Sequence, residues 1–381
     1  MVKPGVIVLG GHVQALGILR ILGKLGLPGI VVDSTAKNIA RHSRYCNYFR
    51  VVKDDDLLDF LIMLGKDANY SGWLIFPTND FHVHLLSNNK SRLEEYFVIA
   101  ADSWESVSLF YNKRLTYKLA EELNIPIANT FFPDSIDELK LPGISFPCII
   151  KPAVMFSFYK QVKRKVFLCR TYDELVSNYR RALKVIPASE IIVQEIIEGP
   201  GINQFSACFL FLDGQNILSL TVCRMRQHPL DFGNATTYAE TVDLPELIEM
   251  GEKILKAAGY NGLCEVEFKK DERDGLYKFL EVNTRTWKWH TIAEKAGIPF
   301  LQQYYEYLTL GVIPSGKRYF PLQASFRHSL TDLYVQFRML TAGQRNWNRL
   351  KKPVQHAVWD KRDILPWIYE KIYFLNLLRT R

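Results

Sequence analysis

The residues of this chain best suited to chemistry are two glutamates, an asparagine and an arginine within one short stretch: Glu267, Glu281, Asn283 and Arg285. Carboxylate and amide oxygens are hard ligands of the kind that Mg²⁺ prefers, and Mg²⁺ commonly shares its shell with nucleotide phosphates. An arginine beside them offers a planar, permanently charged group for phosphate or an acyl phosphate. These residue types predict a magnesium-dependent phosphoryl site; the alternative is a solvated hairpin with an acidic outer face.

A β-hairpin over residues 262–285 is expected to hold these side chains together. Two runs with two-residue alternation, 263–269 and 276–283, flank a turn of sequence DERDG. Alternation puts apolar side chains on one face of each strand and polar side chains on the other. The polar face then carries Glu265, Glu267, Glu281 and Asn283.

The Glu-x-Asn-x-Arg pattern at the end of this hairpin resembles the ATP-grasp ligases. By this resemblance Glu267, Glu281 and Asn283 bind Mg²⁺, with two ions bridging the phosphates of ATP and Mn²⁺ as an alternative metal. Arg285 is then a catalytic residue beside the transferred phosphoryl group. The resemblance covers residues 1 to about 315.

The resemblance implies a multidomain fold of the α/β and α+β classes. An open α/β domain over 1–108 is followed by the ATP-grasp domain over 109–316 and a helical, basic and aromatic extension over 317–381. The pattern VIVLG, then Gly10 and Gly11, then a helical period indicates a βαβ start, although its glycines do not spell GxGxxG.

Polar residues follow the predicted strand at 73–76, where open α/β sheets bind ligands. Asp80 and His82 are therefore candidates for a substrate contact. Capping of the next helix by Asn79 or Asp80 explains the same residues equally well.

Candidate nucleotide ligands are spread over several predicted elements. Lys151 ends an apolar strand, so its ammonium is expected to emerge beside a cleft and contact phosphate. By resemblance Lys113 is the second phosphate lysine, and the strand ending in QEII holds the adenine. The implied ATP-binding set is Lys113, Lys151, Lys165, Gln194, Glu195, Ile196 and Ile197.

The segment 153–165, AVMFSFYKQVKRK, departs from the family because it lacks the glycines of the usual phosphate-covering loop. Its basic residues, including Lys165, predict neutralisation of phosphates by side-chain charge in place of backbone amides. A solvated, charged turn is the alternative.

Arg224 and Arg226 are two residues apart on a predicted strand and are expected on one face. Two guanidinium groups side by side suit a carboxylate, whereas an exposed strand face is the plain alternative. The resemblance favours a role for both as catalytic residues that hold the acyl substrate.

Composition limits the classes of function. The chain has 381 residues, 48% hydrophobic and 23% charged, which is ordinary for a globular protein. Its net charge of +8 is dispersed, and no nucleic-acid-binding motif is present, so no nucleic-acid partner is expected. The six cysteines show no CxxC pair, and neither a signal peptide nor a membrane span is evident, which predicts free thiols and a cytoplasmic protein.

The tail, which ends WIYEKIYFLNLLRTR, is apolar and basic. It is expected to dock on the body of the protein, with peripheral contact to an anionic membrane as the alternative. Homo-oligomers are compatible with the sequence. The tail also resembles those of carboxylate-amine ligases associated with cell-envelope polysaccharides.

The resulting prediction is an ATP- and Mg²⁺-dependent carboxylate-amine or ammonia ligase that acts through an acyl phosphate, in cell-envelope or polysaccharide metabolism. Its partners are a small carboxylate and an amine. Two alternatives stay open: activation of bicarbonate, as in carbamoyl-phosphate synthase or biotin carboxylase, and an ATP-binding sensor or scaffold without turnover.

Overall fold

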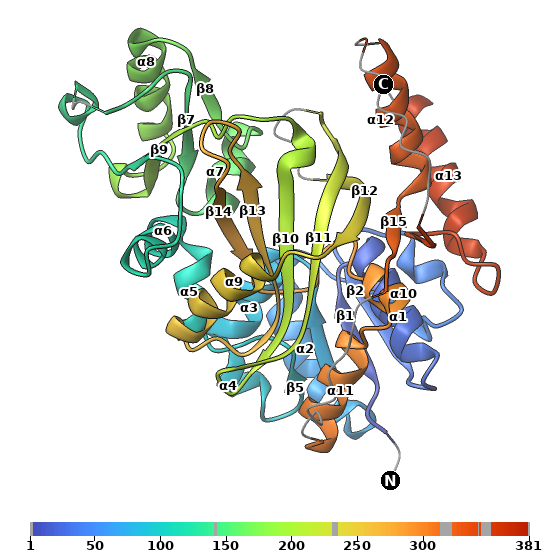
Figure 1. Cartoon of the computed structure of the whole chain (residues 1–381). Helices are drawn as coiled ribbons and strands as arrows, with labels where there is room; N and C mark the ends of the chain where they lie inside the picture. The colour runs from blue at the N-terminus through green and yellow to red at the C-terminus, as the bar shows by residue number, and fades with distance from the viewer. Residues whose placement is uncertain are drawn as a thin grey trace.

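The computed structural model of the chain describes residues 3–140, 143–230, 235–312, 322–341, 343 and 352–379. Within these residues the strands form a five-stranded, a four-stranded and a seven-stranded sheet. The four-stranded sheet and the C-terminal helices lie on opposite sides of the seven-stranded sheet (Figure 1). Short 3-10 turns are η1 (Ala40–His42), η2 (Asp54–Asp56), η3 (Ala68–Tyr70), η4 (Asp137–Lys140), η5 (Ala188–Glu190) and η6 (Gly201–Asn203).

The five-stranded sheet is parallel and has the order β3-β2-β1-β4-β5. Its elements are β1 (Val6–Leu9), α1 (Val13–Gly23), β2 (Gly29–Asp33), β3 (Tyr48–Val51), α2 (Leu57–Gly65), β4 (Leu74–Pro77), α3 (Asp80–Asn88), α4 (Lys90–Leu93) and β5 (Val98–Ile99). Strand β1, VIVL, is buried at every position, as expected for a parallel sheet covered on both faces. The Asn79 side chain accepts a hydrogen bond from the His82 amide at 2.8 Å, so the predicted cap of α3 is confirmed.

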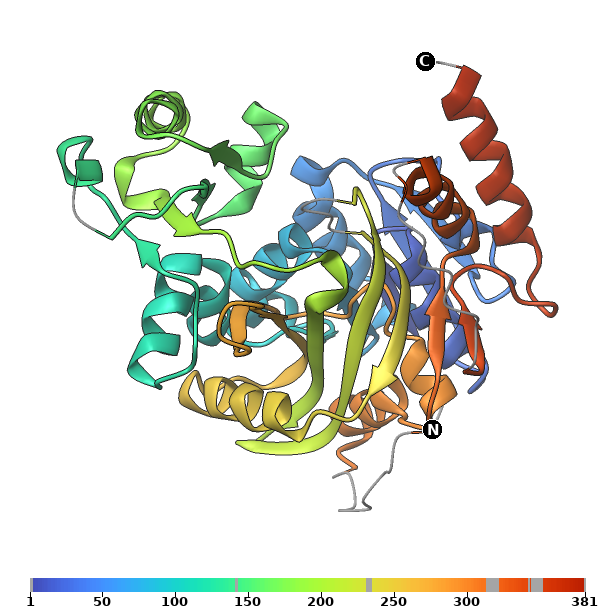
Figure 2. The ribbon, with the colours of Figure 1, turned by 45° about the horizontal axis from the view of Figure 1, so that its top comes forward.

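The four-stranded sheet is antiparallel, in the order β6-β9-β7-β8. The elements of this part are α5 (Trp104–Tyr111), α6 (Lys113–Glu122), β6 (Thr130–Phe131), β7 (Cys148–Pro152), α7 (Met155–Val162), β8 (Phe167–Cys169), α8 (Tyr172–Leu183) and β9 (Ile191–Glu195). Figure 2 shows this part standing apart from the main body, joined through α6 and the chain leading to β10.

Helix α7 corrects the prediction that residues 153–165 form a loop. Met155, Phe158 and Val162 recur at helical spacing, and Phe158 is fully buried against Phe167, with ring centroids 5.6 Å apart. The helix ends at Lys163, whose φ of 56° is left-handed.

The seven-stranded sheet has the order β14-β13-β10-β11-β12-β15-β16 and is antiparallel except for the β15–β16 pair. Its elements are β10 (Gln204–Leu212), β11 (Gln215–His228), β12 (Ala235–Val242), α9 (Pro245–Ala257), β13 (Gly262–Lys270), β14 (Tyr277–Asn283), α10 (Ile292–Ala296), α11 (Phe300–Leu310), β15 (Ser325–Arg327) and β16 (Val354–His356). The predicted β13–β14 hairpin is present, and β10 and β11 form a second hairpin. Helix α9 covers the apolar face, where Leu255, Phe209 and Val266 share one core cluster.

The C-terminal residues dock on the body, which was the first of the two expectations for the tail. Strand β15 pairs with β12, and α12 (Ser329–Thr341) and α13 (Leu365–Arg379) follow. The buried Arg20 side chain of α1 donates to Asp363 at 2.8 Å. His42 stacks on Tyr369 of α13 with ring centroids 3.4 Å apart. The extension is therefore continuous with the sheet and the N-terminal unit.

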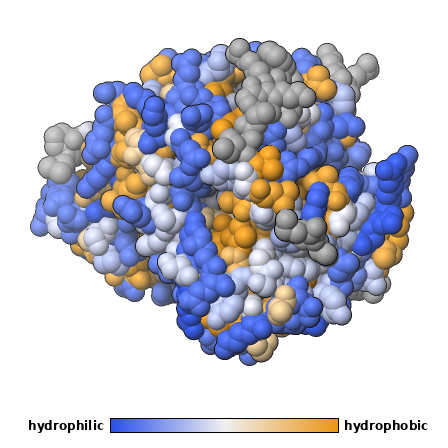
Figure 3. Space-filling view, turned by 90° about the horizontal axis from the view of Figure 1, so that it is seen from below, coloured by the Kyte–Doolittle hydropathy of each residue, from blue (hydrophilic) through white to orange (hydrophobic). Residues whose placement is uncertain are grey.

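No helix within the described ranges is long and apolar enough to cross a bilayer. Hydrophobic patches and hydrophilic side chains are interspersed on the face seen from below (Figure 3). Apolar side chains do stay exposed on the outer side of α13: Leu365, Ile368, Ile372 and Leu375. All six cysteines are free thiols, as predicted.

Candidate active site

The predicted metal ligands lie together on the β13–β14 hairpin. Glu267 and Glu281 are direct cross-strand partners, and Asn283 follows Glu281 two positions along β14. The Asn283 amide nitrogen donates to Glu267 Oε1 at 2.9 Å and to Glu265 Oε2 at 3.2 Å. The shared polar face predicted from alternation is therefore confirmed.

This set of residues fits Mg²⁺ by its donor chemistry. Two adjacent carboxylates and an amide supply hard oxygens, and the Glu281 side chain is 35% exposed, so it is open to a ligand. No group of three or more His, Cys, Asp or Glu side chains in the described part of the chain could hold a metal ion. A metal ion at the hairpin would thus bind two glutamates, the asparagine and groups from a ligand.

Three predicted phosphate lysines surround Glu281. Lys113, the first residue of α6, forms an ion pair with Glu281. This attraction lowers the pKa of Glu281 to about 2, against the effect of burial, and the charges of Lys165 and Lys151 act in the same direction. For Lys113 burial lowers the pKa, but Glu281 outweighs burial and raises it. The site therefore holds positive charge beside oxygen ligands at neutral pH, which suits a metal-bound triphosphate.

Lys151 lies deeper than the sequence predicted. Its side chain on β7 is buried, and Nζ donates to the Tyr117 hydroxyl at 2.5 Å and to Gln194 Oε1 at 2.7 Å. Gln194 in turn donates to Thr130 Oγ1 at 2.7 Å. Lys151 and Gln194 were both predicted to bind the cofactor, and the fold does bring them into contact.

The predicted adenine-binding residues are largely engaged by the protein itself. The buried Glu195 carboxylate accepts from the Asn129 amide at 3.0 Å and from Arg273 at 3.2 Å. Burial raises the pKa of Glu195, but these two partners outweigh it and lower the pKa overall. The Ile197 carbonyl accepts from Lys269 Nζ at 2.7 Å. The Glu195 carboxylate thus secures the DERDG turn, and the roles of Glu195 and of the partly exposed Ile196 in adenine binding stay predictions.

Arg224 and Arg226 do not form the predicted pair. The register of β11 against β12 shifts between them, so the simple alternation is interrupted. Arg224 donates to Glu267 at 3.1 Å, beside the metal ligands. Arg226 forms a buried bidentate pair with Asp332 of α12 at 2.7 and 2.9 Å. Of these two arginines, Arg224 is the one that lies at the hairpin, where it could contact a substrate.

Arg285 joins the hairpin to the N-terminal unit. Its Nε donates to Asp80 Oδ1 at 2.7 Å, and Nη2 donates to Asn283 Oδ1 at 3.2 Å. Asp80, considered above as a substrate contact or a helix cap, is the first residue of α3. Its contact with Arg285 brings the five-stranded sheet to the edge of the site.

Glu265 is a member of the site to which the sequence assigned no role. It is buried, and the Ser206 hydroxyl donates to its Oε1 at 2.9 Å. Burial raises its pKa to about 8, and the charge of Glu267 adds to this, whereas Arg224 opposes it. The site therefore places the Glu265 carboxyl, whose pKa is raised, near the Glu281 carboxyl, whose pKa is lowered. The first glutamate of the E-V-E alternation, Glu265 itself, was the available signal.

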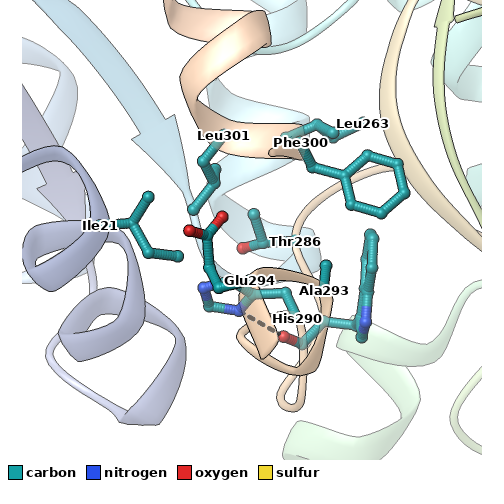
Figure 4. Close-up of a pocket in the computed structure, with 9 residues that line it drawn as sticks. Ile21, Leu263, Thr286, His290, Ala293, Glu294, Phe300 and Leu301 are labelled. Atoms are coloured by element: carbon teal, nitrogen blue, oxygen red, sulfur yellow. Dashed lines mark hydrogen bonds between the residues drawn. The ribbon is translucent and has the colours of Figure 1, made fainter. Parts of the chain in front are cut away.

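His290 is a structural histidine. It is buried, its Nδ1 lies 2.8 Å from the Trp287 carbonyl oxygen, and burial lowers its pKa to about 4. It borders a cavity of about 10 Å³ between α1 and the α10–α11 region (Figure 4). That volume holds at most a water molecule, so this cavity is not a substrate site.

The comparisons with known proteins agree with this geometry. A family model for the ATP-binding domain of the carbamoyl-phosphate synthase L chain matches residues 235–307, which include the β13–β14 hairpin. D-aspartate ligase of Enterococcus faecium is 25% identical over 304 residues, which cover 73% of this chain and 70% of that protein.

Solved structures show the same fold. An L-amino acid ligase from Bacillus licheniformis matches with a TM-score of 0.64 and 14% identity, covering 84% of this chain and 78% of that one. The biotin carboxylase domain dimer of Hydrogenobacter thermophilus 2-oxoglutarate carboxylase, in complex with MgADP, ADP and bicarbonate, matches with a TM-score of 0.65 and 16% identity, covering 82% and 71%. These solved structures show that the chain has the fold of the ATP-grasp ligases, while the family model and the D-aspartate ligase are what its sequence is similar to.

Proposed function

We propose that this protein is a Mg²⁺-dependent ligase that uses ATP to join a carboxylate to an amine or ammonia through an acyl phosphate. The observation that carries this proposal is the convergence of Lys113, Lys151 and Lys165 on Glu281, the cross-strand neighbour of Glu267. Cations for a triphosphate and oxygens for a metal thus meet on one hairpin.

In this proposal Glu267, Glu281 and Asn283 hold Mg²⁺, which would neutralise the phosphate charge during transfer. Lys113 exchanges its ion pair with Glu281 for a contact with phosphate. Arg285, fixed by Asp80 and Asn283, stabilises the transferred phosphoryl group. Phosphoryl transfer depends chiefly on positioning and electrostatics, so no side-chain nucleophile is needed.

In this proposal Lys165 contributes to phosphate binding, which in the family pattern belongs to a glycine-rich loop that this chain lacks. It follows α7, and its pKa is lowered by burial while Glu281 and Glu267 oppose that shift, so its ammonium lies within electrostatic reach of the metal ligands. A side-chain cation at this place can stabilise phosphate without a nest of backbone amides. The helix before it is the part of the site that differs from the family pattern.

The direct test is phosphate release from Mg·ATP with a panel of carboxylates, each with ammonia or an amino acid as acceptor, and with bicarbonate. Stimulated release is expected, and Glu281→Ala should lower it at least 100-fold because Mg²⁺ and Lys113 both lose a partner. Glu272→Ala, on the exposed turn of the same hairpin, is the matched control and should retain activity.

Each other outcome has a distinct meaning. Release stimulated by bicarbonate alone would favour the bicarbonate-activating alternative. Binding of Mg·ATP without stimulated release would favour a sensor. Unchanged activity of Glu281→Ala would remove the hairpin from the mechanism.

A further inference from the structure

The C-terminal extension carries much of the apolar surface that the protein leaves open to water. In the described part of the chain, 24 large apolar side chains are exposed, and 12 of them lie in residues 322–375. This range is a minor part of the 381-residue chain, so the exposed apolar side chains are concentrated there. A concentration of this kind marks an interaction surface, whereas single exposed apolar side chains need no explanation.

The exposed side chains form a stripe on each of the two C-terminal helices. They recur at spacings of three and four residues, which places them on one face of each helix. Helices α12 and α13 lie side by side at one side of the molecule (Figures 1 and 2), and His328 Nε2, just before α12, lies 2.5 Å from Glu370 Oε1 of α13. The apolar stripes consist of Leu333, Phe337 and Leu340 on α12 and of Leu365, Ile368, Ile372 and Leu375 on α13.

The same extension carries most of the net charge of the protein. Residues 322–381 contain 11 lysines and arginines but only 4 acidic residues, so they contribute seven of the eight net positive charges of the chain. The four acidic side chains are all engaged within the protein. Asp332 pairs with Arg226, Asp360 with Lys24 and Asp363 with Arg20, while Glu370 contacts His328.

Basic side chains accompany the apolar stripes. On α13, Lys371 lies beside the stripe, and its Nζ is 3.5 Å from the centroid of the Trp367 ring. Arg338 is exposed on α12 directly after a stripe residue, and Lys361 and Arg362 are exposed just before α13. None of these four basic side chains forms an ion pair with a residue that the structure describes. The extension therefore offers apolar side chains together with cations that are free to meet an external anion.

This combination restricts the class of partner. A second copy of the chain would bring an equally positive extension, so like charges would oppose self-association through this face. A neutral apolar partner would take the cations out of water without supplying counter-charges. The surface of an anionic bilayer supplies both kinds of contact, because its headgroups attract lysine and arginine and its acyl boundary accepts apolar side chains.

We propose that the C-terminal extension binds the surface of an anionic lipid membrane. The apolar stripes of α12 and α13 enter the boundary between headgroups and acyl chains, and the basic side chains beside them contact the phosphates of anionic lipids. The protein then lies on the membrane without crossing it. This inference does not depend on the ligase proposal, because the stripes and the β13–β14 hairpin belong to different elements.

Co-sedimentation of the full chain with lipid vesicles tests the proposal. Vesicles of phosphatidylglycerol and phosphatidylcholine in equal parts are compared with vesicles of phosphatidylcholine alone. The protein should bind the anionic vesicles about 10-fold more tightly or better, because several cations contribute to binding. Raising the salt concentration should weaken this binding, because salt screens the charged contacts.

Substitutions on the stripes test which surface is responsible. Phe337→Glu on α12 and Ile372→Glu on α13 should each weaken binding to anionic vesicles about 10-fold, because a carboxylate is repelled by the headgroups and resists transfer from water. Both positions are exposed, so the fold should be retained, and circular dichroism checks this. Met63→Glu on α2 is the matched control, because Met63 and Phe337 are both 61% exposed, and it should change affinity less than about 2-fold.

The other outcomes would overturn the proposal. Equal binding to both kinds of vesicle would remove the role of the cations, and equal binding by wild type and the stripe variants would remove the role of the stripes. If the wild type binds no vesicles, the membrane is excluded as the partner. A dimer in analytical ultracentrifugation that Phe337→Glu dissociates would then assign the stripes to a second copy, and binding of polyglutamate would assign the extension to an acidic protein.

Discussion

Two clusters of paired acidic and basic side chains lie on the seven-stranded sheet, and they differ in burial and in hydrogen bonding. At the β13–β14 hairpin, the Glu281 side chain is 35% exposed and pairs with Lys113 of α6. At the middle strand of the sheet, Asp332 of α12 is fully buried and pairs with Arg226 of β11. Both clusters contain a carboxylate and basic side chains, so residue type alone does not distinguish them.

The difference lies in how completely the carboxylates are hydrogen-bonded. Asp332 Oδ1 accepts hydrogen bonds from Arg226 and Thr237, and Oδ2 accepts from Arg226, Arg327 and Gln336, all at 2.7 to 3.1 Å. Such a cluster cannot exchange partners without leaving a buried charge. At the hairpin, the Glu281 carboxylate is partly exposed and lies among the charges of Lys113, Lys151 and Lys165, which is what ligand exchange requires. The exposure of the carboxylates and the number of hydrogen bonds that they accept therefore distinguish the candidate site from the structural cluster.

The largest effect expected from this comparison is on stability. Asp332→Ala leaves Arg226 and Arg327 without their shared carboxylate, so we expect unfolding free energy to fall by about 3–5 kcal/mol. Denaturant unfolding measures this loss. Asp332→Asn, which keeps the shape and part of the hydrogen bonding, should lose less.

Mg·ADP affinity of the folded fraction should be unchanged in both Asp332 variants, because the cluster is separate from the metal hairpin. A large loss of nucleotide affinity together with normal stability would mean that Asp332 belongs to the binding site and would reverse the comparison. Arg226→Ala should likewise affect stability more than the Michaelis constant for the acid, contrary to the carboxylate clamp that the sequence predicted.

A smaller effect, dependent on pH, is expected at Glu265. Its pKa is about 8 in the folded protein and near 4.5 when exposed, so folding takes up a proton between these values. The stabilising contribution is complete below pH 4.5 and is lost as pH rises toward 8. Without Mg²⁺ or nucleotide, unfolding free energy should fall by about 2–3 kcal/mol more in the wild type than in Glu265→Gln between pH 5 and 7.

Chemical unfolding at a series of pH values tests this expectation. Glu249→Gln, an exposed carboxylate on α9, is the control and should follow the wild-type profile. Parallel profiles for wild type and Glu265→Gln would show that Glu265 is ionised in the folded protein and that the hairpin holds no neutral carboxyl.

The hairpin was predictable because its signal is local. Two-residue alternation determined which side chains share a face, and the short turn determined which strands pair, so Glu267, Glu281 and Asn283 could be placed together. The βαβ start was predictable for the same reason, since VIVL is an unbroken apolar strand.

The partners of the arginines were not predictable, because they depend on contacts distant in sequence. Arg226 and Asp332 are 106 positions apart, and the register shift after Arg224 leaves no mark in an Arg-x-Arg pattern. Glu195 was likewise paired with Arg273, 78 residues away. Helix α7 was missed for another reason: its apolar period was present, but the family pattern suggested a loop.

The smallest effect expected concerns the basic residues after α7. Lys165 lies within electrostatic reach of Glu281 and Glu267, whereas Lys163 is exposed at the end of the helix. Lys165→Met should raise the Michaelis constant for Mg·ATP about 10-fold, which corresponds to about 1.4 kcal/mol of binding free energy.

Lys163→Met is the matched control, because it removes the same charge two residues away and keeps a Cβ at the left-handed position, so backbone strain is unchanged. Lys163→Met should alter the Michaelis constant for Mg·ATP less than 2-fold. If the two substitutions had equal effects, the segment would act through its overall positive charge, as the solvated-turn alternative implies. A selective effect of Lys165 would instead mean that one positioned ammonium takes the place of a glycine loop. The segment after α7 would then belong to the hairpin cluster.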